Sequence, residues 1–495
     1  MRFRAVLLAS CVGYLLLGWA NSHAHLPTPD RAGMGLLDPA HGVMTVQRYT
    51  LVALVCLYWS ACRLAQVVEE RRAVVVTFWV AGILCCLALP TASADAYAYL
   101  QFGRLAALYH LSPWVHTYAS IHDNYSPLAW YGQTMIYGPV VYPEVWLAGY
   151  LSQWGVAVGL LALKFVHLCV LRVAVAVAER LAAAVQNSTP LVALALNPIV
   201  MVEIVVNGHN DAWLILAATL LLSCLATRRA PVVVGLAAAG VLLVKISGLE
   251  IAGLAMGYLL ATRGKRAFVT ALVTALLTIV SIAWWQLGHV KLIASCWWPS
   301  MVFQGSIPTT AAGLLAAAGP GLQRLGAVLR AASAAWIGLV AATSWYRIRT
   351  SAELVMATTV FFITPLFLVA TYVFPWYLMT PMFLVPLLPE RHRLLYYVAC
   401  GGMFFSFYYR GHLVTTALGI AAAAGLTSAL GHGRHVWPWY GLGIVVLNLM
   451  IPADWLFPVL CVLFEVVPAV VILTLYRKHF YRGAGVLQNA LASQP

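Results

Sequence analysis

The chain has 495 residues and a formal net charge of +14; 62% of its residues are hydrophobic and only 9% are charged. Soluble domains carry about 25% charged residues, so this composition excludes a soluble globular protein. The basic residues stand in ones to threes between apolar runs and form no single patch, which argues against nucleic acid as a partner. The apolar runs are about 15 to 22 residues long, roughly the length that crosses a bilayer as a helix.

The amino-terminal residues 1–92 are predicted to form transmembrane helices. Arg2 and Arg4 precede an apolar run, and the positive-inside rule places such residues in the cytoplasm. We favour an uncleaved first helix, and a signal peptide ending near Ser22-His23-Ala24 is the alternative. In either case the residues that follow, from about 20 to 47, are expected to face outward.

Basic residues at the junctions between later apolar runs set the direction of each crossing. Placed on the cytoplasmic side, they predict about 13 to 16 transmembrane helices with both termini inside. These junctions are Glu69-Glu70-Arg71-Arg72, Arg228-Arg229, Arg263-Gly264-Lys265-Arg266, Arg347 with Arg349, Glu390-Arg391-His392-Arg393, Arg434 and Arg477-Lys478. The loops richest in His, Asp, Trp and Tyr then all fall outside. We therefore expect an all-α polytopic membrane protein without a soluble domain.

Residues 93–156 are predicted to form the first large outer loop, with a helix along the membrane interface at about 139–156. Asp95 is expected where the third helix, predicted over about 73–91, emerges from the membrane. A partly desolvated carboxylate at this position suits a general base, and a helix cap or an ion pair with Arg104 is the alternative. The loop also contains Tyr97, Tyr99 and Tyr137-Gly138-Pro139.

A second polar cluster lies within residues 157–390, which are predicted to be the catalytic transmembrane core. It consists of Asn197-Pro198, Glu203 and Gly208-His209-Asn210-Asp211, at the outer end of two helices. Proline inside an apolar run breaks the helix, which membrane proteins tolerate where protein or a cavity receives the freed carbonyls. Substrate contacts, a structural network and a metal site at His209 and Asp211 all remain open, although the spacing matches no strong zinc pattern.

Further along the chain, Lys245 is expected near the outer end of a helix. Its ammonium could receive a lipid phosphate as a point charge, or the side chain could simply extend to the interface. Phe374-Pro375-Trp376-Tyr377 and Arg410-Gly411-His412 are also predicted on the outer side. Such aromatic residues either belong to the interfacial belt or stack against sugar rings. Residues 391–495 are predicted to be carboxy-terminal transmembrane helices and a short cytoplasmic tail.

Together and in this order, these motifs resemble the GT-C glycosyltransferases, and the nearest likeness is to bacterial polyprenyl-phosphomannose-dependent α-mannosyltransferases. The resemblance covers roughly residues 90 to 390, and two predicted helices precede the usual first one. It rests on Ser93-Ala94-Asp95, Tyr97, Tyr99, Gly103-Arg104, Tyr137-Gly138-Pro139, Asn197-Pro198, Glu203, Gly208-His209-Asn210-Asp211, Lys245 and Pro375-Trp376-Tyr377.

The resemblance implies a GT-C fold in the bacterial inner (plasma) membrane, with a site that faces the periplasm. It implies a polyprenyl-phosphate sugar donor, an outward-facing glycan or glycolipid acceptor, and Asp95 as the base of an inverting transfer. Lys245, Arg410 and His412 are expected at the donor phosphate, and neither a cofactor nor a metal is expected. The sugars are expected to contact Tyr97, Tyr99, Arg104, Tyr137, Glu203, His209, Asn210, Asp211, Trp376 and Tyr377.

Two other classes of protein would also place polar groups in a membrane. A transporter or flippase of lipid-linked glycans is expected to have inverted repeats and interrupted helices that meet near the bilayer midplane. A surface polysaccharide ligase would share the outer placement of the polar residues. The clustering of polar groups at one face favours an enzyme over a transporter.

Overall fold

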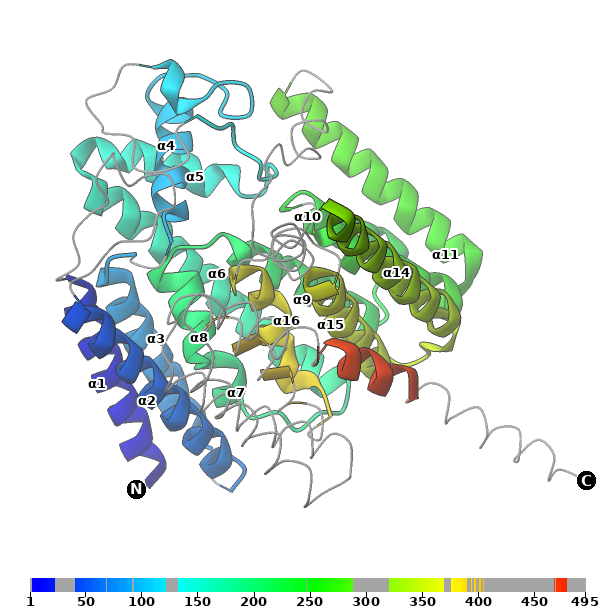
Figure 1. Cartoon of the computed structure of the whole chain (residues 1–495), viewed down its shortest axis with the longest axis horizontal. Coiled ribbons are helices and arrows are strands. Elements are labelled where there is room, and N and C mark those ends of the chain that lie inside the picture. The colour runs from blue at the N-terminus through cyan, green and yellow to red at the C-terminus, as the bar shows by residue number, and fades with distance from the viewer. Residues whose placement is uncertain are drawn as a thin grey trace, which may run out of the picture. The chain divides into compact units, whose positions relative to one another are not determined.

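The structure is a computed structural model. It describes residues 2–22, 41–121, 132–287, 320–368 and 375–389, apart from short gaps at 68, 91–92 and 246, together with residues 393, 396–397, 400–401, 404, 467 and 469–478. The described residues form helices and contain no strand (Figure 1). The prediction of an all-α polytopic membrane protein is therefore confirmed.

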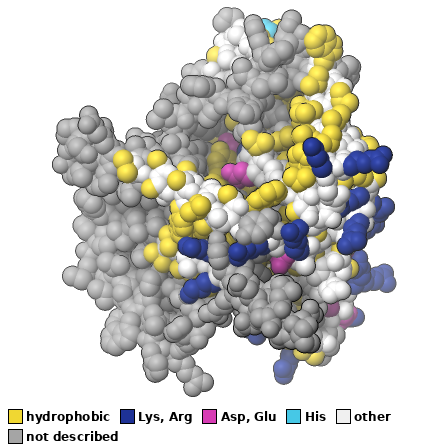
Figure 2. Space-filling model, turned by 90° about the vertical axis from the view of Figure 1, so that its right-hand side faces the viewer, with side chains coloured by type: hydrophobic (Ala, Val, Ile, Leu, Met, Phe, Trp, Pro, Cys, Tyr) yellow, Lys and Arg dark blue, Asp and Glu magenta, His cyan; other side chains and the backbone are white. Residues whose placement is uncertain are grey.

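Three of the described helices are long and apolar enough to cross a membrane by length and composition. They are α1 (Arg2–Ser22), α6 (Val156–Ala184) and the first 35 residues of α11 (Gly248–Leu287). Apolar side chains are exposed along these helices, as lipid contact requires. On α11 they are Leu249, Val269, Val273, Leu276, Leu277, Val280 and Trp284. Figure 2 shows exposed hydrophobic side chains of this kind together with exposed Lys and Arg.

The chain divides into two compact units. The first contains residues 1–252 and 269–299, and the second contains residues 253–268 and 300–495. Helix α11 contributes to both units and is kinked at Gly264, where φ is 80°.

The first unit contains most of the described helices. Besides α1 and α6, they are α2 (His41–Ala65), α3 (Arg71–Leu87), α4 (Asp95–Ala107), η2 (Tyr118–Ser120), α5 (Tyr142–Leu151), η3 (Ser152–Trp154), α7 (Leu191–Ala195), α8 (Pro198–Met201), the π-helical turn η4 (Val202–Val206), α9 (Asp211–Ala226) and α10 (Pro231–Leu242). Helices α2 and α3 both pack against α1, and α6 packs against α9, α5 and α3.

Charged side chains gather at one end of the first unit. Arg4 at the start of α1 pairs with Glu70 at 2.6 Å, and Arg71 pairs with Glu179 near the end of α6. At the other end of α1, the Asn21 amide donates to the carbonyl of Leu89, which follows α3. The 21 residues of α1 span about 31 Å, close to the thickness of the hydrocarbon core of a bilayer.

Helices α4 and α5 cross at unusually close range because each has a glycine at the contact. A Cβ on Gly103 would lie 1.9 Å from the carbonyl oxygen of Val145, and one on Gly149 would lie 2.0 Å from the carbonyl carbon of Gly103. Small residues allow such backbone contact between helices in membranes. This crossing fixes the position of α4, whose first residue is Asp95.

The Tyr137-Gly138-Pro139 motif lies against the segment that follows α10. The Gly138 N–H donates to the Val244 carbonyl at 2.9 Å, and the Val140 N–H donates to the Leu243 carbonyl at 3.2 Å. A Cβ on Gly138 would lie 2.1 Å from the Leu243 carbonyl oxygen, so only glycine fits. The glycine therefore has a structural role, because this close backbone contact brings Tyr137 beside Lys245.

The described helices of the second unit include α14 (Pro320–Ser344), η5 (Trp345–Arg347), α15 (Ser351–Leu368), η6 (Pro375–Leu378), α16 (Met379–Leu384) and η7 (Val385–Leu387). Arg349 donates to the carbonyl of Ala261 at 2.7 Å, which joins the start of α15 to α11. The basic junctions at 263–266 and 347–349 therefore lie near each other within this unit, although more than 80 residues separate them in sequence.

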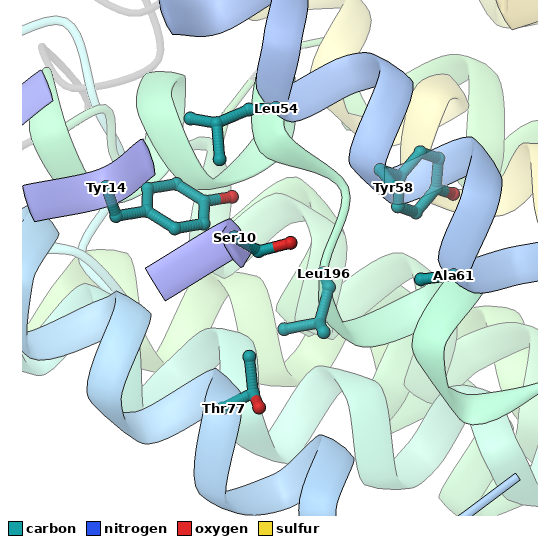
Figure 3. Close-up of a pocket in the computed structure, with 7 residues that line it drawn as sticks. All are labelled: Ser10, Tyr14, Leu54, Tyr58, Ala61, Thr77 and Leu196. Carbon is teal, nitrogen blue, oxygen red and sulfur yellow. The ribbon is translucent and has the colours of Figure 1, made fainter. Parts of the chain in front are cut away.

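A small cavity in the first unit lies among α1, α2 and α3 (Figure 3). Its volume is about 10 Å³, which is room for roughly one water molecule and not for a sugar. It contains no carboxylate, so it is not a candidate for the chemistry of the protein. Its lining consists of Ser10, Tyr14, Leu54, Tyr58, Ala61, Thr77 and Leu196.

Candidate active site

Asp95 opens α4, so it does not lie at the end of the preceding helix, where the hydropathy pattern predicts it. Helix α3 stops at Leu87 instead of about residue 91, because Pro90 cannot continue a helix. A carboxylate in the first turn of a helix is favoured by the helix dipole. The backbone N–H of Asp95 donates to the Ser93 hydroxyl at 3.2 Å, which fixes the start of this turn.

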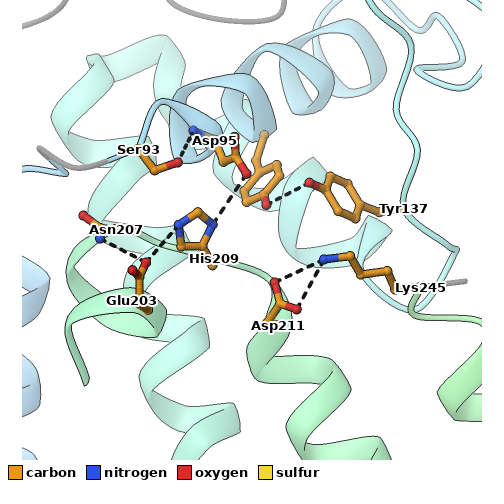
Figure 4. Close-up of polar contacts among 9 residues, drawn as sticks. Ser93, Asp95, Tyr137, Glu203, Asn207, His209, Asp211 and Lys245 are labelled. Carbon is orange, nitrogen blue, oxygen red and sulfur yellow. Dashed lines mark hydrogen bonds and ion pairs between the residues drawn. The ribbon is translucent and has the colours of Figure 1, made fainter. Parts of the chain in front are cut away.

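His209 joins Asp95 to a second carboxylate. Its Nδ1 lies 3.5 Å from Asp95 Oδ2, and its Nε2 lies 3.2 Å from Glu203 Oε2 (Figure 4). The imidazole is completely buried. Gly208 precedes it with φ +69°, a conformation that residues with side chains rarely adopt, and a Cβ added to Gly208 would lie 3.0 Å from the Cβ of Ala96 in α4. The glycine therefore allows the loop to place His209 directly beside the start of α4.

Glu203 lies on the π-helical turn η4 and is fully buried. Single π turns inside helices occur frequently at functional sites. The Asn207 amide donates to Glu203 Oε2 at 3.2 Å, so this carboxylate is held by both His209 and Asn207. In Figure 4 the imidazole stands between Glu203 and Asp95, which makes Glu203 a support for His209.

The two carboxylates keep His209 protonated. Burial lowers the pKa of His209, but hydrogen bonds and charge interactions with Asp95 and Glu203 outweigh burial and raise the pKa from 6.5 to about 9. The imidazole is therefore positively charged at neutral pH, and the cluster consists of one cation between two acids.

A second ion pair lies further along the same loop. Lys245 Nζ lies 3.3 Å and 3.4 Å from the two oxygens of Asp211, the first residue of α9. The same ammonium stands 5.9 Å from the centre of the Tyr137 ring. Tyr99 donates to the Tyr137 hydroxyl at 3.2 Å, and the two rings meet edge to face. Lys245, Asp211 and these tyrosines thus form one polar cluster beside the Asp95 cluster (Figure 4).

Arg104 and Tyr97 are both buried in α4. Arg104 donates to the Tyr118 hydroxyl at 3.2 Å and to the Ser152 hydroxyl at 3.0 Å. These bonds connect α4 to η2 and η3, so Arg104 stabilises the packing of α4 against these two segments.

Apart from Asn210, the remaining predicted site residues lie in the second unit or outside the described residues. Trp376 and Tyr377 belong to the second unit, where Trp376 is buried and its ring meets that of Tyr377 edge to face. Arg410 and His412 lie outside the described residues. Among the described residues, no group of three or more His, Cys, Asp or Glu is arranged to hold a metal ion.

The sequence reasoning missed Lys164, which is fully buried in α6. Its ammonium donates to the carbonyl of Ala88 at the end of α3, where a cation is favoured by the helix dipole. Its Cγ lies 3.7 Å from the position that a Cβ on Gly208 would occupy. Lys164 therefore supports the turn between α3 and Asp95. The available signal was a lysine within an apolar run, Leu161-Ala162-Leu163-Lys164-Phe165.

The fold defines a helical membrane protein with paired acids and bases at the ends of its helices. Comparison of the sequence with known protein families identifies the class of protein more specifically. The sequence profile of the alpha-(1->6)-mannopyranosyltransferase N-terminal domain matches residues 4–261, more than half of the chain, and the chain belongs to this family. A comparison with curated proteins gave no match. The matched region contains Asp95, His209 and Lys245, and the protein is accordingly a mannosyl-transferring glycosyltransferase.

Proposed function

We propose that the protein transfers mannose from a polyprenyl-phosphate donor to an outward-facing glycan or glycolipid, with inversion at the anomeric carbon. The observation that supports this proposal best is the Asp95 carboxylate, held 3.5 Å from the buried His209 at the start of α4. Such a carboxylate can accept a proton from a sugar hydroxyl. The lipid-linked donor suits an enzyme whose site lies at one end of membrane helices.

In the proposed reaction an acceptor hydroxyl oxygen attacks the anomeric carbon of the donor mannose. The new C–O bond forms as the bond to the phosphate oxygen breaks, and polyprenyl phosphate leaves with the electron pair. Asp95 takes the proton of the attacking hydroxyl. A general base of this kind contributes about 10² to 10⁴ in rate. His209 orients the Asp95 carboxylate, while Glu203 balances the charge of the imidazolium.

Lys245 is the cation proposed for the leaving phosphate. Its ammonium lies 3.3 Å and 3.4 Å from the two oxygens of Asp211, which hold it in place. Positive charge near the leaving oxygen stabilises the transition state more than the ground state. Arg410 and His412 remain predicted partners of the same phosphate. Tyr97, Tyr99, Tyr137, Trp376 and Tyr377 remain proposed sugar contacts.

We propose that the site faces away from the cytoplasm of a bacterium, across its inner membrane. Two ion pairs at one end of the first unit, Arg4–Glu70 and Arg71–Glu179, involve residues that the positive-inside rule places in the cytoplasm. The Asn21–Leu89 contact, which marks the opposite end of α1 and α3, precedes Asp95 closely in sequence. The separation of these groups supports the extracytoplasmic orientation.

The test is Asp95→Asn in proteoliposomes that contain labelled polyprenyl-phosphomannose and mannolipid acceptors. We expect a loss of about 10² to 10⁴ in kcat, an equally slowed release of polyprenyl phosphate, and a lower Tm because the buried His209 imidazolium loses one of its two acids. Glu70→Gln is the matched control, because it removes an acid at the opposite end of the first unit and should leave turnover intact. Near-normal turnover of a folded Asp95→Asn protein would refute the role of Asp95.

A further inference from the structure

Asn210 stands at the N-cap of α9 but does not cap it. Its side chain makes no hydrogen bond to the first turn, the residue is 1% exposed, and neither Nδ2 nor Oδ1 has a hydrogen-bond partner. Asn197, at the N-cap of α8, behaves in the usual way, since its side chain accepts from the N–H groups of Ile199 and Val200. The Asn210 amide is therefore a buried donor and acceptor that the fold itself does not use.

A second such group lies in the same turn. The Trp213 backbone N–H donates to the carbonyl of Asn210 at 3.0 Å, while its indole Nε1–H is buried without a partner. Buried polar groups in folded proteins nearly always have a partner, and exceptions call for an explanation such as a ligand. Two exceptions within one helical turn point to one ligand.

The neighbours of Asn210 in sequence indicate where that ligand would lie. His209 contacts Asp95, the proposed base, and Asp211 contacts Lys245, the proposed phosphate partner. A mannosyl unit undergoing transfer must lie between the base that activates its acceptor and the cation that receives its leaving group. In the sequence, Asn210 lies between His209 and Asp211, at the start of α9. Its side chain is therefore a candidate contact for this mannosyl unit.

We propose that the Asn210 amide and the Trp213 indole N–H form a pyranose subsite for the donor mannosyl unit; this inference rests on the proposed function. The amide donates to one sugar hydroxyl and accepts from another, and the indole N–H donates to a third oxygen. All of these groups are neutral, which suits neutral hydroxyls rather than a phosphate. A site built to hydrogen-bond a hydroxyl discriminates strongly against a substrate that lacks it.

Two substitutions remove these groups. Asn210→Leu removes the amide, and Trp213→Phe removes the indole N–H but keeps an aromatic ring. Because the Asn210 amide has no partner in the ligand-free protein, we expect Asn210→Leu to retain or exceed the wild-type Tm. Trp213→Phe leaves space behind and should lower the Tm slightly. Asn207→Leu is the matched control, since the Asn207 amide is buried in the same loop and bonded to Glu203. It should lower the Tm.

The functional measurement uses polyprenyl-phosphomannose and its 2-, 3-, 4- and 6-deoxy analogues. Each lost hydrogen bond should lower kcat/KM by roughly two- to tenfold. The two deoxy analogues that lack a hydroxyl contacted by the amide should be poor substrates for the wild type. Neither should lower the kcat/KM of Asn210→Leu any further, as a thermodynamic cycle requires for direct contact.

Two results would overturn the subsite. One is a Tm of Asn210→Leu that falls as far as that of Asn207→Leu, which would show a structural role. The other is a wild-type penalty for every deoxy analogue that persists unchanged in Asn210→Leu. A wild-type protein that releases no polyprenyl phosphate would instead refute the proposed donor, and the Tm comparison would still decide whether the Asn210 amide serves the ligand-free fold.

Discussion

The close crossing of α4 and α5 makes Gly149→Ala a sharp test of how the site is positioned. The added methyl group would lie 2.0 Å from the carbonyl carbon of Gly103 and 2.4 Å from the amide nitrogen of Arg104. Both atoms belong to the backbone, so no side chain can turn away to make room. Real Cβ contacts are essentially never shorter than 3.0 Å, so the two helices must separate by about 1 Å, a distance set by that limit.

This separation has two measurable consequences. Overpacking of a well-packed contact costs about 1 to 3 kcal/mol, and rigid backbone neighbours place Gly149→Ala toward the upper value. Helix α4 carries Asp95 at its first turn, and a misplacement of about 1 Å can cost 10²-fold in rate. We therefore expect both a lower Tm and a loss of mannosyl transfer on the order of 10- to 100-fold.

The assay compares Tm in detergent and transfer in proteoliposomes for Gly149→Ala and Gly240→Ala. Gly240 lies inside α10, and a methyl group added there would have no neighbouring atom within 4 Å. Alanine at this position should therefore be neutral or stabilising by up to about 1 kcal/mol. Wild-type Tm and turnover in Gly149→Ala would refute the close crossing as the determinant of the α4 position. Equal losses in both variants would show that the effect is not specific to the crossing.

Three further predictions concern the charged groups. Folding raises the pKa of His209 from 6.5 to about 9, so the stabilisation that protonated His209 gives the fold is complete below pH 6.5 and is lost as pH rises through about 9. The Tm of the wild type should therefore decline over this range, and the Tm of His209→Gln should not. Identical Tm–pH profiles of the two proteins would contradict this role of His209. Lys245→Met leaves Asp211 buried without its cation and should destabilise by roughly 3 kcal/mol, and adding Asp211→Asn should restore part of the Tm; no recovery would argue against coupling. Glu203→Gln should lower kcat with little change in donor KM, whereas a raised KM alone would indicate a substrate contact.

Much of the fold could be predicted from hydropathy, because a helix that faces lipid must be apolar over its whole length. The apolar runs at 5–17 and 157–183 correspond to α1 and α6. Hydropathy predicts the end of α3 too late because it reports burial and not backbone geometry. Pro90 is itself apolar and does not interrupt a hydropathy run, yet its ring ends the helix before Asp95.

The sequence predicts which residues belong to the candidate site, but not which of them contact one another. Asp95, Glu203, His209 and Asp211 stood out because ionisable residues are costly near a membrane. Which acid would contact His209 depends on Gly208, whose positive φ sets the direction of the loop. The partners of Lys245 depend on the backbone contact between Gly138 and Leu243. Neither conformation is visible in residue types alone.

The π-helical turn at Val202–Val206 also makes the length of this segment part of its chemistry. A π turn contains more residues than an α turn, so deleting one residue from it could restore regular α-helical geometry without exposing any apolar side chain. Each residue in a regular helix advances about 100° around the axis, so such a deletion would rotate the loop that follows. A folded chain could thus keep all of its ionisable residues and still lose their alignment through a change in count alone.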